Sequence, residues 1–165
     1  MKKMEQQFSY TAYESIQELN AADQELMNAA KSATGLAYAP YSKFRVGAAA
    51  RLENGVILKG SNQENASFPV GICAERVLLS VASSLYPEVP ILEMAISYKN
   101  EMGKSDNPIS PCGICRQSLL EFEMKTQQSI RLLLAGEIGA VYEVPKAHDL
   151  LPLGFTSADL LAGVK

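Results

Sequence analysis

The sequence predicts an α/β protein with helices packed on both faces of a mixed, five-stranded sheet. Segments with apolar residues at helical spacing alternate with segments that have the pattern of strands. The composition agrees, because 47% hydrophobic and 20% charged residues are typical of a globular protein. We find no internal repeat, linker or low-complexity segment, so we expect a single domain over residues 1–165.

The first helix is expected over residues 21–37. Asn20 and Asp23 have capping-box spacing, and Leu26 begins a series of apolar residues at helical intervals. The helix should end before Pro40, because the residue that precedes a proline avoids the helical region.

A β-hairpin should follow this helix. Residues 44–52 alternate between apolar and other side chains, which is the period of a strand. Asn54-Gly55 is a strong hairpin signal, and residues 56–62 then form the returning strand.

The remainder of the chain alternates between helices and strands. One helix is expected to open at Cys73, a second near Cys112, and a short final one at Ser157, which would cap it. The other three strands are expected over residues 91–98, 130–135 and 140–144.

Charge and hydropathy exclude several classes of protein. The net charge is −3, and no basic cluster exceeds Lys2-Lys3, whereas a protein that binds nucleic acid normally carries a basic stripe. No apolar run is long enough to cross a bilayer, and the N-terminal segment lacks the apolar core of a signal peptide. We therefore expect a cytoplasmic protein without nucleic-acid or membrane partners.

The three cysteines, Cys73, Cys112 and Cys115, are candidate metal ligands. An odd number of cysteines in a reducing compartment fits metal binding or catalysis better than disulfides. Both cysteine motifs fall at predicted helix starts, where free N–H groups and the helix dipole favour thiolates. Three converging thiolates form a soft site suited to Zn²⁺.

This zinc site should keep one open position, which is typical of catalysis. His148, the one histidine, lies in a polar stretch and is better interpreted as a surface residue than as a fourth ligand. A thioredoxin-like redox pair is a weaker alternative for Cys112 and Cys115, because it would not require Cys73-Ala74-Glu75.

Glu75 and Arg76 follow the first cysteine. Glu75 could reach a metal-activated water without binding the metal and would act as the proton carrier, although an acid here also stabilises a helix start. Arg76 either donates hydrogen bonds to the thiolates or is a solvated helix residue.

These motifs closely resemble those of the small, all-cysteine cytidine deaminases. CAE (73–75) and PCGIC (111–115) match the signature of the zinc nucleobase deaminases. The likeness extends in the expected order over YAPYSKFRVGAA (38–49), GSNQENASFPVGICAER (60–76), SPCGICRQ (110–117) and LLPLGF (150–155). Residues 1–20 lie outside it and suggest an extra strand or an interface segment.

The resemblance implies a three-layer α-β-α fold, a homotetramer and one zinc ion per subunit. It implies hydrolytic deamination of free cytidine and 2′-deoxycytidine in pyrimidine salvage, with release of ammonia. Cys73, Cys112 and Cys115 would hold the zinc. A zinc-bound hydroxide would attack C4 while Glu75 moves protons.

The resemblance also implies a set of substrate contacts. Asn62 and Glu64 would bind the sugar hydroxyls, and their spacing on an extended segment places both side chains on one face. Phe44 would pack beside the nucleoside, and the backbone amide of Ala74 would meet the pyrimidine carbonyl. Phe155 would come from a neighbouring subunit.

Three alternatives stay open. A relative that acts on a blasticidin-type antibiotic is disfavoured by Asn62-x-Glu64, and a polynucleotide-editing deaminase is disfavoured by the acidic net charge. A non-catalytic zinc module would have no need for Glu75. Phe68 stands where many members of the family that this chain resembles have tyrosine, so this chain has no hydroxyl at that position.

Overall fold

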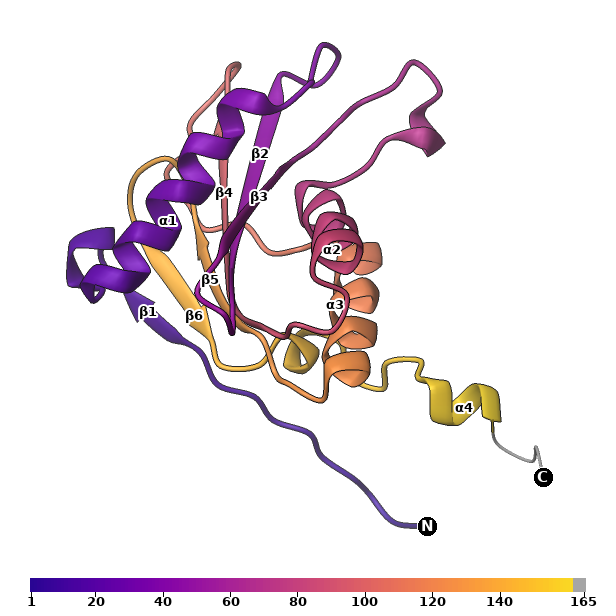
Figure 1. Ribbon diagram of the computed structural model, residues 1–165. Helices are drawn as coiled ribbons and strands as arrows, with labels where there is room; N and C mark the ends of the chain where they lie inside the picture. The colour runs from indigo at the N-terminus through magenta and orange to yellow at the C-terminus, as the bar shows by residue number, and fades with distance from the viewer. Residues whose placement is uncertain (162–165) are drawn as a thin grey trace.

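The computed structural model describes residues 1–161, which form a mixed six-stranded sheet with helices on both faces (Figure 1). The strand order is β1-β6-β5-β4-β2-β3, and the β4/β5 pair is parallel while the other neighbouring pairs are antiparallel. The prediction of an α/β fold with helices on both faces is confirmed. The strands are β1 (Thr11–Tyr13), β2 (Phe44–Leu52), β3 (Ile57–Ser61), β4 (Ile91–Asn100), β5 (Arg131–Ala135) and β6 (Val141–Val144). The helices are α1 (Ala21–Ala33), α2 (Ala74–Leu85), α3 (Gly113–Thr126) and α4 (Ser157–Leu161).

The prediction of five strands is wrong by one, because β1 joins the sheet at the edge of β6. Thr11 pairs with Glu143, and the Tyr13 hydroxyl donates to the Glu143 carboxylate at 2.7 Å. Only three residues of the N-terminal segment pair with β6, which is too short a stretch for a period of two to be recognised. The N-terminal segment therefore supplies an extra strand.

The first helix is shorter than predicted. Asn20 accepts a hydrogen bond from the Asp23 N–H at 2.9 Å, so the predicted cap is confirmed. However, α1 ends at Ala33 and the chain continues as a 3-10 turn, η2 (Thr34–Leu36). Apolar spacing does not distinguish a final 3-10 turn from another α-helical turn.

The predicted hairpin and the two cysteine-bearing helices are confirmed within a residue or two. Gly55 has φ 83°, as the tight turn between β2 and β3 requires. The predicted cap of α4 is wrong by one residue, because Ser157 is already the first residue of the helix. The preceding Thr156 donates from its N–H and from its hydroxyl to the Asp159 carboxylate, each at 2.8 Å. No helix within residues 1–161 is both long enough and apolar enough to cross a membrane.

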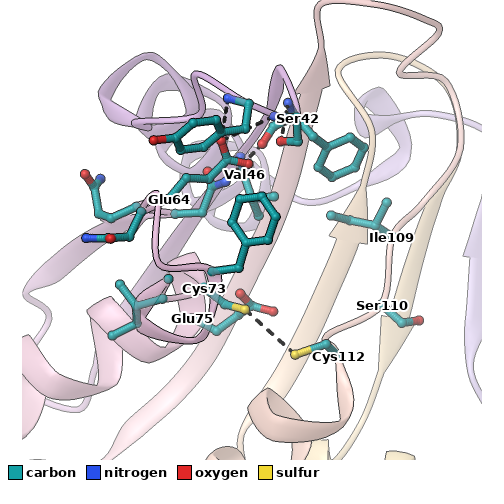
Figure 2. A pocket seen from close by; sticks show the side chains of 16 residues that line it. Ser42, Val46, Glu64, Cys73, Glu75, Ile109, Ser110 and Cys112 are labelled. Atoms are coloured by element: carbon teal, nitrogen blue, oxygen red, sulfur yellow. Dashed lines mark hydrogen bonds between the residues drawn. The ribbon is translucent and has the colours of Figure 1, made fainter.

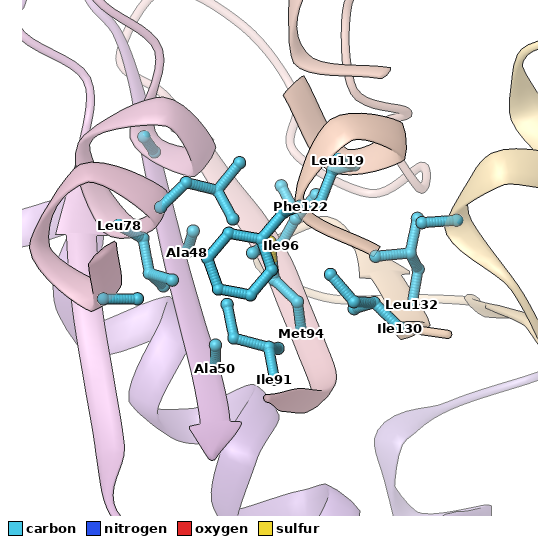
Figure 3. Packing of buried hydrophobic residues seen from close by; sticks show 14 of the residues in the cluster. Ala48, Ala50, Leu78, Ile91, Met94, Ile96, Leu119, Phe122, Ile130 and Leu132 are labelled. Carbon is cyan, nitrogen blue, oxygen red and sulfur yellow. The ribbon is translucent and has the colours of Figure 1, made fainter. Parts of the chain in front are cut away.

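Alternation along the strands sends side chains to two separate cores. Ala49 of β2 faces α1, whereas Ala48 and Ala50 face α2 and α3. The core beneath α2 and α3 is the larger one (Figure 3). Fully buried members of this larger core include Leu78, Met94, Ile96, Leu119 and Leu132. The larger core holds α2 and α3 side by side on one face of the sheet.

An ionic cluster joins α1 to the sheet on the opposite face. Arg131 of β5 contacts Asp23 and Glu93, and Arg51 of β2 donates to Glu93 at 2.9 Å and to Glu25 at 3.1 Å. The pairs to Asp23 and Glu93 are partly buried, whereas the Arg51–Glu25 pair is exposed. The pairs share partners, so they act as one network rather than as isolated surface pairs.

Gly60 of β3 sets how closely α2 approaches the sheet. A Cβ at this position would lie 2.4 Å from the Ala74 carbonyl oxygen and 2.8 Å from the Leu78 nitrogen. Both atoms belong to the backbone and cannot move without shifting the helix. The absence of a side chain therefore positions the first turn of α2, which follows Cys73 directly.

We expect Gly60→Ala to destabilise the protein by about 1–3 kcal/mol, the usual cost of overpacking a core. Urea unfolding measures this free energy. Gly35→Ala is the matched control, since a Cβ there meets nothing within 4 Å. Equal unfolding free energies for the two variants would contradict this account of the helix–sheet distance.

Candidate zinc centre and substrate pocket

Two helix N-termini bring the cysteines together. Cys73 is the N-cap of α2, and Cys112 is the N-cap of α3, both with extended backbone. Cys115 lies in the first turn of α3 and is buried, whereas Cys112 is exposed. The free N–H groups and the positive dipole ends of both helices therefore favour negative charge at one place.

The sulfur positions fit a zinc ion. The Cys73–Cys112 sulfurs lie 3.8 Å apart, the Cys112–Cys115 sulfurs lie 3.4 Å apart, and all three fall within 4.8 Å of one another. Tetrahedral coordination at about 2.3 Å per Zn–S bond requires sulfurs about 3.8 Å apart. Three sulfurs at these distances can bind Zn²⁺ and leave the fourth position open.

Contacts with its neighbours favour the thiolate form of Cys73. A hydrogen bond from the Cys115 thiol lowers the pKa of Cys73 to about 6. The same interaction raises the pKa of Cys115, because its proton is held by the Cys73 sulfur. The Arg76 charge also favours the Cys73 thiolate, although less strongly.

His148 lies outside the cysteine cluster. Its Nδ1 is 2.8 Å from an oxygen of the buried Glu123 carboxylate. Among residues 1–161, the group of side chains that could hold a metal consists of the three cysteines alone. His148 is thus half-exposed and paired with a carboxylate, rather than simply solvated.

Glu75 lies beside the sulfurs at the floor of the pocket and is 4% exposed. Burial raises the pKa of its carboxyl, which favours a proton on this group more than in water. A carboxyl with a raised pKa can both accept and return a proton near neutral pH.

A cavity of about 750 Å³ opens above the sulfurs and Glu75 (Figure 2). This volume is in the usual range for small-molecule sites. The polar part of its wall includes Asn62 and Glu64, and Phe44, Val46 and Ile109 supply apolar surface. Two of the three predicted metal ligands, Cys73 and Cys112, therefore line the same pocket as the predicted sugar-binding pair.

Glu64 has one carboxylate oxygen fixed by backbone donors. Its Oε2 accepts from the Tyr41 N–H at 2.9 Å and from the Ser42 N–H at 3.3 Å. A hydrogen bond from the Ser42 side chain is the largest of the effects that hold the pKa of Glu64 below its usual value. Glu64 therefore faces the pocket as a carboxylate, which accepts hydrogen bonds.

Both polar atoms of the Asn62 side-chain amide form hydrogen bonds with strand β2. Its Oδ1 accepts from the Val46 N–H at 2.7 Å, and its Nδ2 donates to the Phe44 carbonyl at 2.9 Å. An amide oxygen and an NH₂ group each retain capacity for a further hydrogen bond. Asn62 therefore supports the wall at Phe44 as well as lining the pocket.

The sequence analysis did not identify Tyr41 and Ser42. Their N–H groups lie in a turn after Pro40, where Lys43 has φ 57° and its N–H bonds back to Ala39. Pro40 could have pointed to these two residues, because proline favours a turn. The N–H groups in a turn often lack a backbone acceptor and can donate to a side chain such as Glu64.

The other predicted site residues differ in their relation to the pocket. Phe44 lines it and stacks on Tyr98 with ring centroids 4.7 Å apart. Ala74 is the first residue of α2, and its N–H therefore has no acceptor within the helix.

Two predicted residues lie outside the cavity wall of their own chain. Phe155 is 55% exposed, and its carbonyl accepts from Gln117 at 2.8 Å. Arg76 lines a separate groove between α2 and α3, and we find no hydrogen bond from its guanidinium to sulfur within residues 1–161.

Comparison with known proteins gives a consistent result. A family model described as the cytidine and deoxycytidylate deaminase zinc-binding region matches residues 20–129. The cytidine deaminase of Halalkalibacterium halodurans is 35% identical over 137 residues, which cover 83% of this chain and 96% of the relative. That of Sporosarcina psychrophila is 36% identical over 139 residues, covering 83% and 93%.

Solved structures agree with the sequence relatives. The crystal structure of cytidine deaminase from Burkholderia pseudomallei superposes with a TM-score of 0.70 at 35% identity, covering 83% of this chain and 100% of that one. The enzyme from Mycobacterium tuberculosis gives a TM-score of 0.64 at 29% identity, covering 83% and 99%.

Zinc should protect the cysteine sulfurs from a thiol reagent. In the folded, zinc-loaded protein we expect little reaction with 5,5′-dithiobis(2-nitrobenzoate), because metal-bound thiolates are held in the site. Removing zinc with a chelator should expose the thiols and lower the melting temperature, since the ion stabilises the folded state. Identical reactivity and melting with and without zinc would exclude binding at this site.

Proposed function

The chain belongs to the cytidine and deoxycytidylate deaminase family, and from this premise we propose that it hydrolyses free cytidine and 2′-deoxycytidine to the uridine nucleosides and ammonia. The observation that supports this most strongly is the shared pocket, in which Glu75 adjoins three converging sulfurs and Glu64 lines the same cavity. We further propose that the reaction depends on zinc held by Cys73, Cys112 and Cys115. Bound there, zinc would act as a Lewis acid that makes water more acidic.

Glu75 is the proton carrier in this proposal. Its buried carboxylate takes a proton from the attacking water and delivers it to ring nitrogen N3, which makes C4 electrophilic. Glu75 then transfers the remaining proton of the new hydroxyl to the departing amine. One water is consumed, one C–N bond is broken, and ammonia leaves.

The wall residues orient the nucleoside. Glu64 and Asn62 bind the sugar hydroxyls at one end of the pocket, and Phe44 packs beside the nucleoside. The Ala74 N–H, which has no acceptor within its helix, donates to the pyrimidine carbonyl. Arg76 adds positive charge near the Cys73 sulfur, where it favours the thiolate.

The charges of the pocket favour a free nucleoside over a nucleotide. Among the described residues, the cavity wall carries the two carboxylates Glu64 and Glu75 and no lysine or arginine. A 5′-phosphate would enter this acidic wall without a cation to pair with. The net charge of −3 likewise disfavours a polynucleotide substrate.

We also propose that the enzyme is a cytoplasmic homotetramer that acts in pyrimidine salvage. Phe155 supports a shared site, because its ring is exposed and outside its own pocket, where a neighbouring subunit can receive it.

An ultraviolet assay with cytidine tests the reaction and the role of Glu75 together. Wild-type protein should remove the cytosine absorbance and release ammonia. Glu75→Gln should bind zinc and fold normally but turn over about 10²–10⁴-fold more slowly, which is the usual contribution of general acid–base catalysis. Glu53→Gln, at the exposed tip of the β2–β3 hairpin, is the control. Near-normal turnover by Glu75→Gln would remove it from the mechanism.

The role of Glu64 is tested by pairing a variant with a shortened substrate. Glu64→Gln should lower kcat/KM for cytidine by about 10–100-fold, as expected for losing a hydrogen bond to a charged group. 2′,3′-Dideoxycytidine lacks the 2′ and 3′ hydroxyls, so Glu64→Gln should lower kcat/KM far less with this substrate than with cytidine. An equal loss with both substrates would show that Glu64 does not contact the sugar.

A further inference from the structure

Arg116, in the first turn of α3, joins two backbone segments that are distant in sequence. Its Nε donates to the Pro111 carbonyl at 2.9 Å, and its Nη1 donates to the Leu150 carbonyl at 2.9 Å. Pro111 and Leu150 are buried, and Arg116 itself is half-buried. Pro111 directly precedes the metal ligand Cys112, and Arg116 directly follows the metal ligand Cys115.

The loop that leads to Cys112 makes few other hydrogen bonds to the rest of the described chain, although Ile109 packs against the large core. Residues 101–112 contain no helix or strand, and Ser105 fixes the first half of the loop through bonds with Asn100 and Ile138. From Asp106 to Pro111, the hydrogen bond from Arg116 is the only one in the described structure that reaches beyond the loop. This bond therefore helps to place Cys112, together with the Arg116 N–H, which donates to the Cys112 carbonyl at 2.9 Å.

The second segment that Arg116 contacts, at Leu150, is firmly held. Leu150 closes the 3-10 turn η4 (Ala147–Leu150), which is held by the buried carboxylate of Glu123. Glu123 accepts from the Ala147 N–H at 3.2 Å and from the His148 N–H at 3.1 Å. Arg116 thus connects the loop that leads to Cys112 to a firmly held turn.

We propose that Arg116 is a positioning residue for the zinc centre, which acts by holding the Pro111 carbonyl and thereby Cys112. The planar guanidinium presents two donors at fixed spacing, which a lysine ammonium on a flexible stem does not reproduce. Groups that orient metal ligands usually affect metal affinity by about 10–100-fold when they are changed. The proposal rests on zinc binding at the three cysteines and does not depend on the identity of the substrate.

The test measures the rate at which the zinc-loaded full chain releases metal to an excess of 4-(2-pyridylazo)resorcinol. Arg116→Gln should release zinc about 10–100-fold faster than wild type. Arg116→Lys should also release it faster, because one ammonium cannot replace the two-carbonyl bridge.

The control is Arg51→Gln, which removes an arginine from the ionic cluster on the opposite face of the sheet. It should leave the release rate unchanged even where it lowers the melting temperature, which separates positioning of the ligand from general stability. A second readout is the visible spectrum of the cobalt-substituted protein, whose ligand-field bands should shift in both Arg116 variants and stay constant in Arg51→Gln.

Wild-type zinc release and an unchanged cobalt spectrum in the folded Arg116→Gln protein would overturn the proposal. If Arg116→Gln does not fold, Arg116→Lys decides, and wild-type behaviour in that variant would overturn it equally. Because neither measurement involves turnover, a failed cytidine assay would leave this result standing.

Discussion

The convergence of two helix N-termini on one face of the sheet is the constraint on which the rest of this structure depends. α2 and α3 begin at Cys73 and Cys112, and their first turns must meet closely enough for three sulfurs to share one ion. The large core beneath the two helices fixes the spacing between them. Because Gly60 has no side chain, the first turn of α2 can lie close to the sheet. Small shifts in either helix would separate the sulfurs, since a metal site tolerates errors of only about 0.2 Å per ligand bond.

Charge explains why the site is built at helix ends. Three thiolates on one divalent cation leave an excess of negative charge, which raises the pKa of bound water and opposes catalysis. Two positive helix ends offset part of this excess, and the Arg76 charge favours the Cys73 thiolate. The carboxyl of Glu75 is kept out of water beside this cluster, where it can hold a proton more readily than an exposed glutamate.

Neighbouring strands and loops hold different parts of the pocket wall in place. Asn62 fastens the end of β3 to the start of β2 and so fixes the backbone at Phe44. The turn after Pro40 supplies the donors that orient Glu64. The polar wall is therefore preorganised by backbone groups, which lose little conformational freedom when a ligand binds.

The sequence by itself determined the parts of this protein that depend on neighbours a few residues apart. Helix starts at Cys73 and Cys112, the hairpin at Asn54-Gly55 and the placement of Glu75 follow from local propensity and spacing, and the resemblance assigned their roles. Only the tertiary structure decided which distant groups meet: Tyr13 with Glu143, Glu64 with the N–H of Tyr41, and Arg116 with the carbonyl of Leu150. The physical reason is that such contacts depend on strand register and on distances between packed elements, which no local periodicity of side chains records.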